Sequence, residues 1–241
     1  MLRLFWLVIV STPYIFYYFF KLIYVEQHPE KYDEEARYAI GRNMVSAAMR
    51  NSFVQTRAYG IENLPKEGGY IMYPNHQGEF DVLGIVRSHE KPCTFVMDNK
   101  RSQLPFANEF IRLLKGARLN RSDMRSQVET ILQIAKEVSS GRRYILFPEG
   151  GYAFNENHLQ EFHAGSFKCA LKARCPIVPV LLIDSYKVFA SYTLRPLVTQ
   201  VHFLPPIPYE EYKDMNTTQI AETVKETIKS KMDQLASSKA K

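Results

Sequence analysis

The run Tyr73-Pro74-Asn75-His76-Gln77-Gly78-Glu79-Phe80-Asp81 decides the fold of this chain. It follows a Gly68-Gly69 turn and residues 70–73, which read as a short buried strand. Pro74 and Asn75 form a breaker pair that stops the strand. Residues 81–88 carry apolar side chains at helical spacing. A buried strand that leads through a loop into a helix is typical of an α/β protein.

His76 and Asp81 are the first candidates for chemistry. On one continuous helix, residues five positions apart are rotated by about 140°, so the two side chains meet only if residues 77–79 form a tight loop, which Gly78 permits. A carboxylate that accepts the Nδ1 proton of an imidazole fixes its tautomer and leaves Nε2 as a general base. The alternative is structural, with His76 capping a strand end and Asp81 capping a helix N-terminus.

The sequence offers no nucleophile to complete a hydrolytic triad with this pair. It contains no serine on a G-x-S-x-G elbow and no papain-like cysteine. We therefore expect that the hydroxyl deprotonated by His76 belongs to the substrate.

Two further apolar segments are predicted to be strands. Residues 143–147 read as a central strand that Pro148-Glu149-Gly150-Gly151 ends abruptly, leaving a carboxylate at the carboxyl edge where α/β sheets bind ligands. Residues 176–182 form an apolar strand that contains Pro176 and Pro179. Prolines suit an edge strand or the beginning of a strand, so we expect one of those positions.

Together these motifs resemble the glycerolipid acyltransferase family, most closely its 1-acylglycerol-3-phosphate (lysophosphatidate) acyltransferases. The resemblance runs from about Tyr59 to Pro206 in four ordered blocks: His76 with Asp81, residues 100–121, residues 147–150 and residues 176–179. It implies that the histidine is the general base and the aspartate orients it. It also implies that the second and third blocks bind the glycerol phosphate of the acceptor, with Glu149 and Gly150 shaping that site.

This chain departs from the family pattern at the third block. Gly151 and Tyr152 follow the F-P-E-G run, where the family commonly has threonine and arginine, and Gly78 replaces a common serine. Losing the arginine removes a bidentate phosphate ligand, so other basic residues must replace it or the acceptor differs. The candidates are Lys100 and Arg121, then Arg101, with Arg142 and Arg143 disfavoured because they begin a strand. The alternative is that this basic stretch is only a solvated helix face.

Composition limits the class of protein. The 241 residues are 46% hydrophobic and carry a formal net charge of +6, which suits one sizeable catalytic core. Three cysteines without C-x-x-C spacing argue against a disulfide framework or a zinc site and favour a reducing compartment. No metal or cofactor is expected. Without any nucleic-acid-binding motif, the basic balance points to an anionic membrane rather than to nucleic acid.

The N-terminus supports the membrane interpretation. Residues 4–20 carry no charge and are rich in aromatic side chains, but they are short for a span and contain Pro13. We expect a monotopic anchor, more than a single-pass span, on the cytoplasmic face of the cell membrane. A cleaved signal peptide and a buried core helix are the alternatives. A second helix over residues 32–51 completes a two-helix anchor, residues 1–51, before a catalytic domain, residues 52–241.

The expected fold is therefore α/β, with a mixed central sheet flanked by helices and an N-terminal two-helix membrane anchor. The resemblance implies transfer of a fatty acyl group from acyl-CoA or acyl-carrier protein to 1-acylglycerol-3-phosphate, forming phosphatidate. Glycerol-3-phosphate or another lysophospholipid is an alternative acceptor. A non-catalytic membrane lipid-binding protein is the alternative of a different class. The expected partners are the bilayer, the acceptor lipid and, for one donor, acyl-carrier protein.

Overall fold

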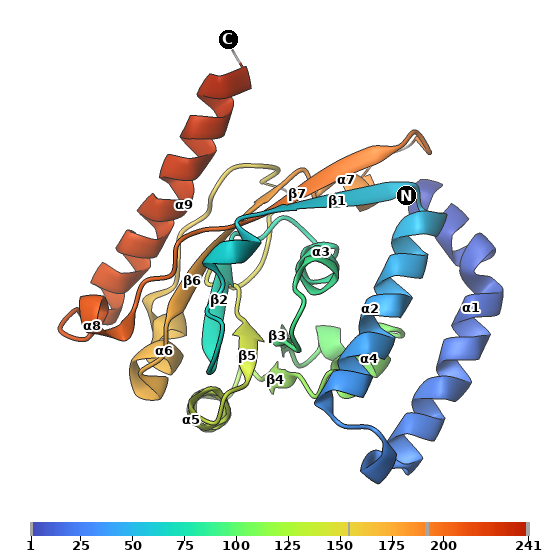
Figure 1. Ribbon diagram of the computed structural model, residues 1–241, viewed down its shortest axis with the longest axis horizontal. Coiled ribbons are helices and arrows are strands. Elements are labelled where there is room, and N and C mark those ends of the chain that lie inside the picture. The colour runs from blue at the N-terminus through green and yellow to red at the C-terminus, as the bar shows by residue number, and fades with distance from the viewer. Residues whose placement is uncertain (1, 154, 191–192, 240–241) are drawn as a thin grey trace.

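The computed structural model describes residues 2–153, 155–190 and 193–239. Within these residues one seven-stranded sheet has the order β1-β7-β6-β2-β5-β3-β4 (Figure 1). The strands are β1 (Val54–Tyr59), β2 (Tyr70–Pro74), β3 (Thr94–Asp98), β4 (Ala117–Leu119), β5 (Arg143–Ile145), β6 (Ile177–Ile183) and β7 (Leu197–Phe203). The sheet is mixed because β7 pairs antiparallel with β6 and parallel with β1, while β2 to β6 are mutually parallel.

Helices cover both faces of the sheet, as expected from the sequence (Figure 1). One face carries α1 (Leu2–Gln27), α2 (Glu34–Asn51), α3 (Asp81–Ser88) and α4 (Ala107–Leu113). The other carries α5 (Met124–Ser139), α6 (Lys168–Ala173) and α9 (Thr217–Lys239). Shorter helical pieces are η1 (Pro29–Lys31), η2 (Ile61–Asn63), η3 (Arg101–Gln103), η4 (Ala164–Phe167), α7 (Lys187–Ala190) and α8 (Tyr209–Tyr212).

Strand β2 shows why this sheet is buried on both faces. Tyr70 and Met72 join the core beneath α1 to α4, whereas Ile71 and Tyr73 join the core beneath α5, α6 and α9. All four are at most 1% exposed. Alternate side chains of a strand point to opposite faces, so a strand between two helical layers must be apolar at every position. The run 70–73 meets this requirement.

The parallel arrangement brings five strand ends to one edge. The carboxyl ends of β2, β3, β4, β5 and β6 face the same side because these strands run in the same direction. The segments that follow them carry His76, Arg101, Arg121, Glu149 and Ser185. In α/β sheets this edge is where ligands bind.

The position of β6 differs from the edge-strand expectation. Pro176 precedes the strand, but Pro179 lies inside it, and β6 sits between β7 and β2. The Pro179 carbonyl accepts a hydrogen bond from Leu204 N at 3.0 Å, just past the end of β7. The missing Pro179 N–H therefore faces irregular backbone and removes no bond from the regular β6–β7 ladder.

The two expected N-terminal helices differ in their surroundings. Residues Phe5–Gln27 of α1 are long and apolar enough to cross a membrane, with a mean hydropathy of 1.5 and 11% of the segment buried. The helix runs beyond the predicted residues 4–20 and includes Pro13. Helix α2 instead directs Tyr38, Val45 and Met49 into the domain core, so its apolar face is already occupied. Met1, Ala240 and Lys241, at the ends of the two expected domains, lie outside the described residues.

Candidate active site

His76 and Asp81 are in contact. His76 Nδ1 lies 2.7 Å from Asp81 Oδ2, and the same oxygen accepts the backbone N–H groups of Gln77 at 2.6 Å and Gly78 at 3.0 Å. Asp81 is fully buried, whereas 17% of the His76 side chain is exposed. With Nδ1 donating its proton to the carboxylate, Nε2 is the basic nitrogen of the ring.

The loop between the two residues brings them into contact, and the Asp81 side chain does not cap the helix. Asp81 begins α3, but its carboxylate binds N–H groups of the preceding loop, and the helix N-cap, Phe80, makes no side-chain capping bond. The loop closes through Asp81 N to Gly78 O at 3.2 Å. Gly78 has no positive φ, and a Cβ there would meet nothing within 4 Å. The tight loop forms as the sequence permits, and a serine at this position would also fit.

Two aromatic rings enclose the imidazole. Phe147, just after β5, stacks on His76 with ring centroids 4.1 Å apart, and Tyr152 approaches edge-on at 5.0 Å. The Tyr152 hydroxyl donates to Glu79 and accepts from Arg101 Nη1 at 3.2 Å. The Arg101 guanidinium also lies 5.1 Å from the centre of the Tyr152 ring, within cation–π range. Arg101 is thus linked to the histidine through one aromatic side chain.

Glu149 is a buried carboxyl group beside this pair. It is 6% exposed, Gln160 Nε2 donates to its Oε2 at 2.5 Å, and its Oε1 is buried without a hydrogen-bond partner among the described residues. Burial raises the Glu149 pKa from its ordinary value of 4.5 to about 6, and hydrogen bonding to Gln160, hydrogen bonding to the His76 backbone and the charge of His76 oppose the increase. The unpaired oxygen gives Glu149 capacity to bind a hydroxyl donor.

Gly150 is required by its conformation and by its neighbours. Its φ is +71°, and a Cβ there would lie 2.9 Å from His163 Cδ2 and 3.6 Å from Arg121 Nη1. A side chain would therefore strain the turn and displace the His163 ring. The close approach also places the Arg121 guanidinium, which lies 3.8 Å from Asp98 Oδ2, next to the F-P-E-G turn.

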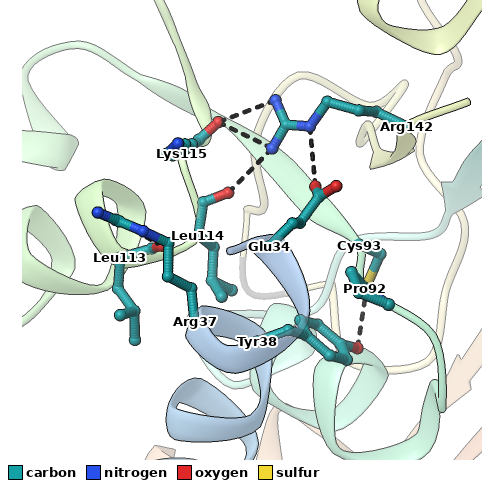
Figure 2. A pocket seen from close by; sticks show the side chains of 9 residues that line it. All are labelled: Glu34, Arg37, Tyr38, Pro92, Cys93, Leu113, Leu114, Lys115 and Arg142. Atoms are coloured by element: carbon teal, nitrogen blue, oxygen red, sulfur yellow. Dashed lines mark hydrogen bonds and ion pairs between the residues drawn. The ribbon is translucent and has the colours of Figure 1, made fainter. Parts of the chain in front are cut away.

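The other basic candidates for binding phosphate differ in their contacts. The Lys100 side chain is exposed and makes no hydrogen bond or ion pair with the described residues, although its backbone N–H donates to Asp98. Arg142 pairs with Glu34 and binds the carbonyls of Leu114 and Lys115 (Figure 2). The 250 Å³ cavity of Figure 2 is lined by the start of α2 and by residues that precede β3, β4 and β5, so it lies at the edge opposite His76.

Sequence reasoning missed several polar residues around the pair. They come from the post-β5 segment, defined as residues 151–153 and 155–163, and from the end of β6. Asn155 Nδ2 donates to His76 O at 3.4 Å, and Gln77 Nε2 donates to Asn157 Oδ1 at 2.7 Å. Ser185 Oγ donates to Asp81 Oδ1. Only the place of Ser185, just past a predicted strand, could have drawn attention to it.

The described residues do not gather a metal site or a reactive thiol. No group of three or more His, Cys, Asp and Glu side chains among them is placed to bind a metal ion. Cys93, Cys169 and Cys175 are buried, and burial raises the pKa of each thiol to about 12. A thiol with that pKa is a poor nucleophile at neutral pH.

Comparison with known proteins identifies the family. The acyltransferase family model matches residues 55–183, which include both the histidine–aspartate pair and the F-P-E-G turn. This chain belongs to the acyltransferase family.

Individual relatives of this acyltransferase-family chain agree in their names. It is 27% identical over 184 residues to a 1-acyl-sn-glycerol-3-phosphate acyltransferase of Saccharomyces cerevisiae, covering 73% of this chain and 59% of the relative. A protein of the same name from Borreliella burgdorferi is 28% identical over 166 residues, covering 67% of this chain and 66% of the relative. The chain thus spans about three-fifths to two-thirds of the length of these two relatives.

A solved structure shares the fold of this acyltransferase-family chain. The crystal structure of the 1-acyl-sn-glycerophosphate (LPA) acyltransferase PlsC from Thermotoga maritima superimposes with a TM-score of 0.79. The alignment covers 98% of this chain and 95% of that chain at 21% identity. The likeness therefore includes the N-terminal helices as well as the sheet.

Proposed function

We propose that this protein transfers a fatty acyl group from an acyl thioester to the free hydroxyl of 1-acylglycerol-3-phosphate, forming phosphatidate. The observation that carries the proposal is the His76–Asp81 contact at the carboxyl edge of the parallel strands. The names of the relatives favour this acceptor. Glycerol-3-phosphate or another lysophospholipid remains the second candidate acceptor because Tyr152 occupies the position of the usual arginine.

In the proposed mechanism His76 and Asp81 are the catalytic pair. Nε2 of His76 removes the proton of the acceptor hydroxyl as its oxygen attacks the thioester carbonyl. Asp81 holds the ring in the required tautomer and stabilises the imidazolium that forms. When the carbon–sulfur bond breaks, His76 returns the proton to the thiolate. The thioester is already activated, so neither an acyl-enzyme nor a metal ion is needed.

Arg121 and Arg101 are the proposed ligands of the acceptor phosphate. Arg121 lies beside the F-P-E-G turn, and Arg101 lies on the Tyr152 ring beside the imidazole. Both guanidinium groups can bind phosphate oxygens in the bidentate manner of the missing arginine. Lys100 follows β3 near them and remains a proposed ligand, with a side chain free to reorient in solvent. Glu149 and Gly150 are proposed to shape the glycerol subsite.

Helix α1 is proposed to be a monotopic anchor on the cytoplasmic face. At its start, Arg3 is 1% exposed and donates to the carbonyls of Ser52, Thr193 and Arg195. At its end, Glu26 forms an ion pair with Arg112 at 2.6 Å. Both ends are thus attached to the same globular domain, which favours a helix lying in one leaflet over one whose ends reach opposite aqueous phases.

A purified-protein assay tests the activity. Full-length protein in detergent–phospholipid micelles is given one of two donors, acyl-CoA or acylated acyl-carrier protein, with the label on the acyl group. The acceptor is lysophosphatidate, glycerol-3-phosphate or lysophosphatidylcholine. Labelled phosphatidate from lysophosphatidate is the expected product, and His76→Ala is the matched inactive control. Product from another acceptor alone would replace the proposed substrate. Binding of lipid without release of thiol from either donor would favour the lipid-binding alternative.

A further inference from the structure

Ser185 occupies a buried position behind the His76–Asp81 pair. It follows β6 by two residues and is 4% exposed. Its hydroxyl lies within hydrogen-bond distance of Asp81 Oδ1 and of Gln77 Oε1, the latter at 2.8 Å. The mechanism above gives this hydroxyl no role, although burying a polar group is unfavourable unless it is well paired.

The Ser185 hydroxyl has one proton, which we assign to the hydrogen bond with Asp81. Gln77 Oε1 already accepts the backbone N–H of Ser185 at 2.9 Å, so it has a donor without the hydroxyl. A carboxylate is also a stronger acceptor than an amide carbonyl. The order of the three side chains is therefore Ser185, Asp81, His76. In a hydrolytic triad the histidine lies between the other two, so Ser185 is not placed as a nucleophile toward His76 Nε2.

The two carboxylate oxygens of Asp81 accept hydrogen bonds from different parts of the chain. Oδ2 receives His76 Nδ1 and two backbone N–H groups of the adjoining loop. Among the described residues, the donor to Oδ1 is the Ser185 hydroxyl. Without that donor a fully buried carboxylate oxygen would be unpaired, and the carboxylate could rotate about its own axis. Rotation would move Oδ2 away from the histidine.

We propose that Ser185 is a positioning residue that fixes the Asp81 carboxylate and, through it, the His76 ring. The inference rests on the proposed acyl transfer for its kinetic test but not for its spectroscopic one. The Ser185 backbone is held independently of its hydroxyl, because Gln77 binds Ser185 N, donates to Leu182 O at 3.1 Å and donates to Asn157. Ser185→Ala should therefore remove one hydrogen bond and leave the strand end in place.

The kinetic experiment compares Ser185→Ala with Ser88→Ala in the full-length protein. Ser88 is a buried serine on α3, the helix that Asp81 begins, and its hydroxyl donates to Gly84 O at 2.8 Å. Ser185→Ala is expected to lower kcat by about 10- to 100-fold. A loss of this size is typical when a hydrogen-bonding group that orients a metal-binding side chain is removed, and Ser185 orients Asp81 in the same way. The KM for donor and acceptor should stay within about twofold, and Ser88→Ala should change kcat by less than about twofold.

A double-mutant cycle separates positioning from a general loss of structure. If Ser185 acts through His76, adding Ser185→Ala to His76→Ala should change the residual turnover by less than about twofold. An equal loss in both backgrounds would overturn the proposal. Ser185→Cys, which keeps a weak donor in nearly the same volume, should recover part of kcat, and it replaces the alanine variant if that protein does not fold.

Proton NMR of the protein without substrate gives a readout that does not require activity. The Nδ1–H proton of His76, which donates to a buried carboxylate, should give a downfield resonance that His76→Ala removes. Ser185→Ala should shift or broaden that resonance, whereas Ser88→Ala should leave it unchanged. An unaltered resonance in Ser185→Ala would refute the positioning role. If the wild-type protein transfers no acyl group but the resonance responds as expected, the proposed function fails and the positioning role stands.

Discussion

Tyr152 meets the His76 imidazole edge-on, with ring centroids 5.0 Å apart and ring planes at 72°. This tyrosine stands where the family commonly has arginine, and Arg101 lies against it from η3. Hydrogen bonding to the Tyr152 hydroxyl raises the Arg101 pKa further above neutrality. A cation from the second block thus lies against the tyrosine that replaces the family's arginine.

The first prediction concerns the proposed general base. His76→Ala should lower turnover by about 10² to 10⁴, the usual contribution of general-base catalysis, while acceptor binding survives. Asp81→Asn should also impair turnover because it favours the wrong imidazole tautomer. Steady-state kinetics and equilibrium binding of the acceptor measure the two effects. His28→Ala is the control, because His28 follows α1 and stacks on Tyr24. Near-normal turnover in a folded His76→Ala protein would show that His76 is not the general base.

The second prediction concerns the phosphate ligands. Arg121→Ala and Arg101→Ala should each raise the acceptor KM about 10-fold or more and leave the donor KM nearly unchanged, because a charged contact to phosphate is lost. Lys100→Ala tests the third proposed ligand in the same assay. Arg125→Ala is the matched control, since that side chain is 89% exposed and pairs with Glu129 on the same helix. Unchanged acceptor kinetics in all three variants would place the phosphate elsewhere.

The third prediction concerns the pH dependence of stability at Glu149. Its pKa is raised by burial from 4.5 to about 6, so the neutral form favours folding below pH 4.5 and this contribution is lost as the pH rises through about 6. Glu149→Gln should therefore raise the free energy of unfolding at pH 8 by about 2 kcal/mol, with little change near pH 4. It should also lower turnover, because stability and function compete at such sites.

Urea unfolding of Glu149→Gln at the two pH values measures this difference. Glu161→Gln is the control, because Glu161 is 90% exposed and pairs with Lys225 at the surface. The change in the free energy of unfolding caused by Glu161→Gln should be similar at the two pH values. Equal stabilisation by Glu149→Gln at both pH values would mean that burial of the charge is not the cause.

The fourth prediction concerns the membrane anchor. Phe5, Phe16 and Phe20 on α1 are at least 60% exposed, and burying such side chains in lipid contributes roughly 1.5–3 kcal/mol each. Replacing all three with glutamine should release the protein from phospholipid vesicles in a flotation assay. It should also depress activity on bilayer acceptor more than on dispersed acceptor. Met124→Gln, an exposed apolar side chain on α5, should have neither effect.

The orientation of the anchor is tested separately. A tag added before Met1 should be inaccessible to an impermeant reagent outside intact cells, because a monotopic helix leaves both of its ends on the cytoplasmic side. Deleting residues 1–24 should likewise shift much of the protein into the soluble fraction. Labelling of the tag from outside would show that α1 spans the membrane.

Local patterns predicted the elements that carry the site. The strand at residues 70–73 and the helix at residues 81–88 follow from one short run, because strand, breaker and helix signals act over a few residues. The contact of His76 with Asp81 is one of the two interpretations that this run left open. Helix α1 was predicted too short, since Lys21 ends the uncharged run but does not end the helix. A charged residue changes solvation at a helix surface without breaking the backbone pattern.

The sequence by itself determined the histidine–aspartate pair, the F-P-E-G turn and the α/β class, because each depends on the spacing of neighbouring residues. Tertiary structure alone decided which distant groups join them. Ser185 reaches Asp81 across 104 residues because β6 lies beside β2, and Arg101 rather than Lys100 meets Tyr152 because η3 turns that side chain toward the end of β5. Strand order and helix rotation arise from packing of the whole core, which no local pattern encodes.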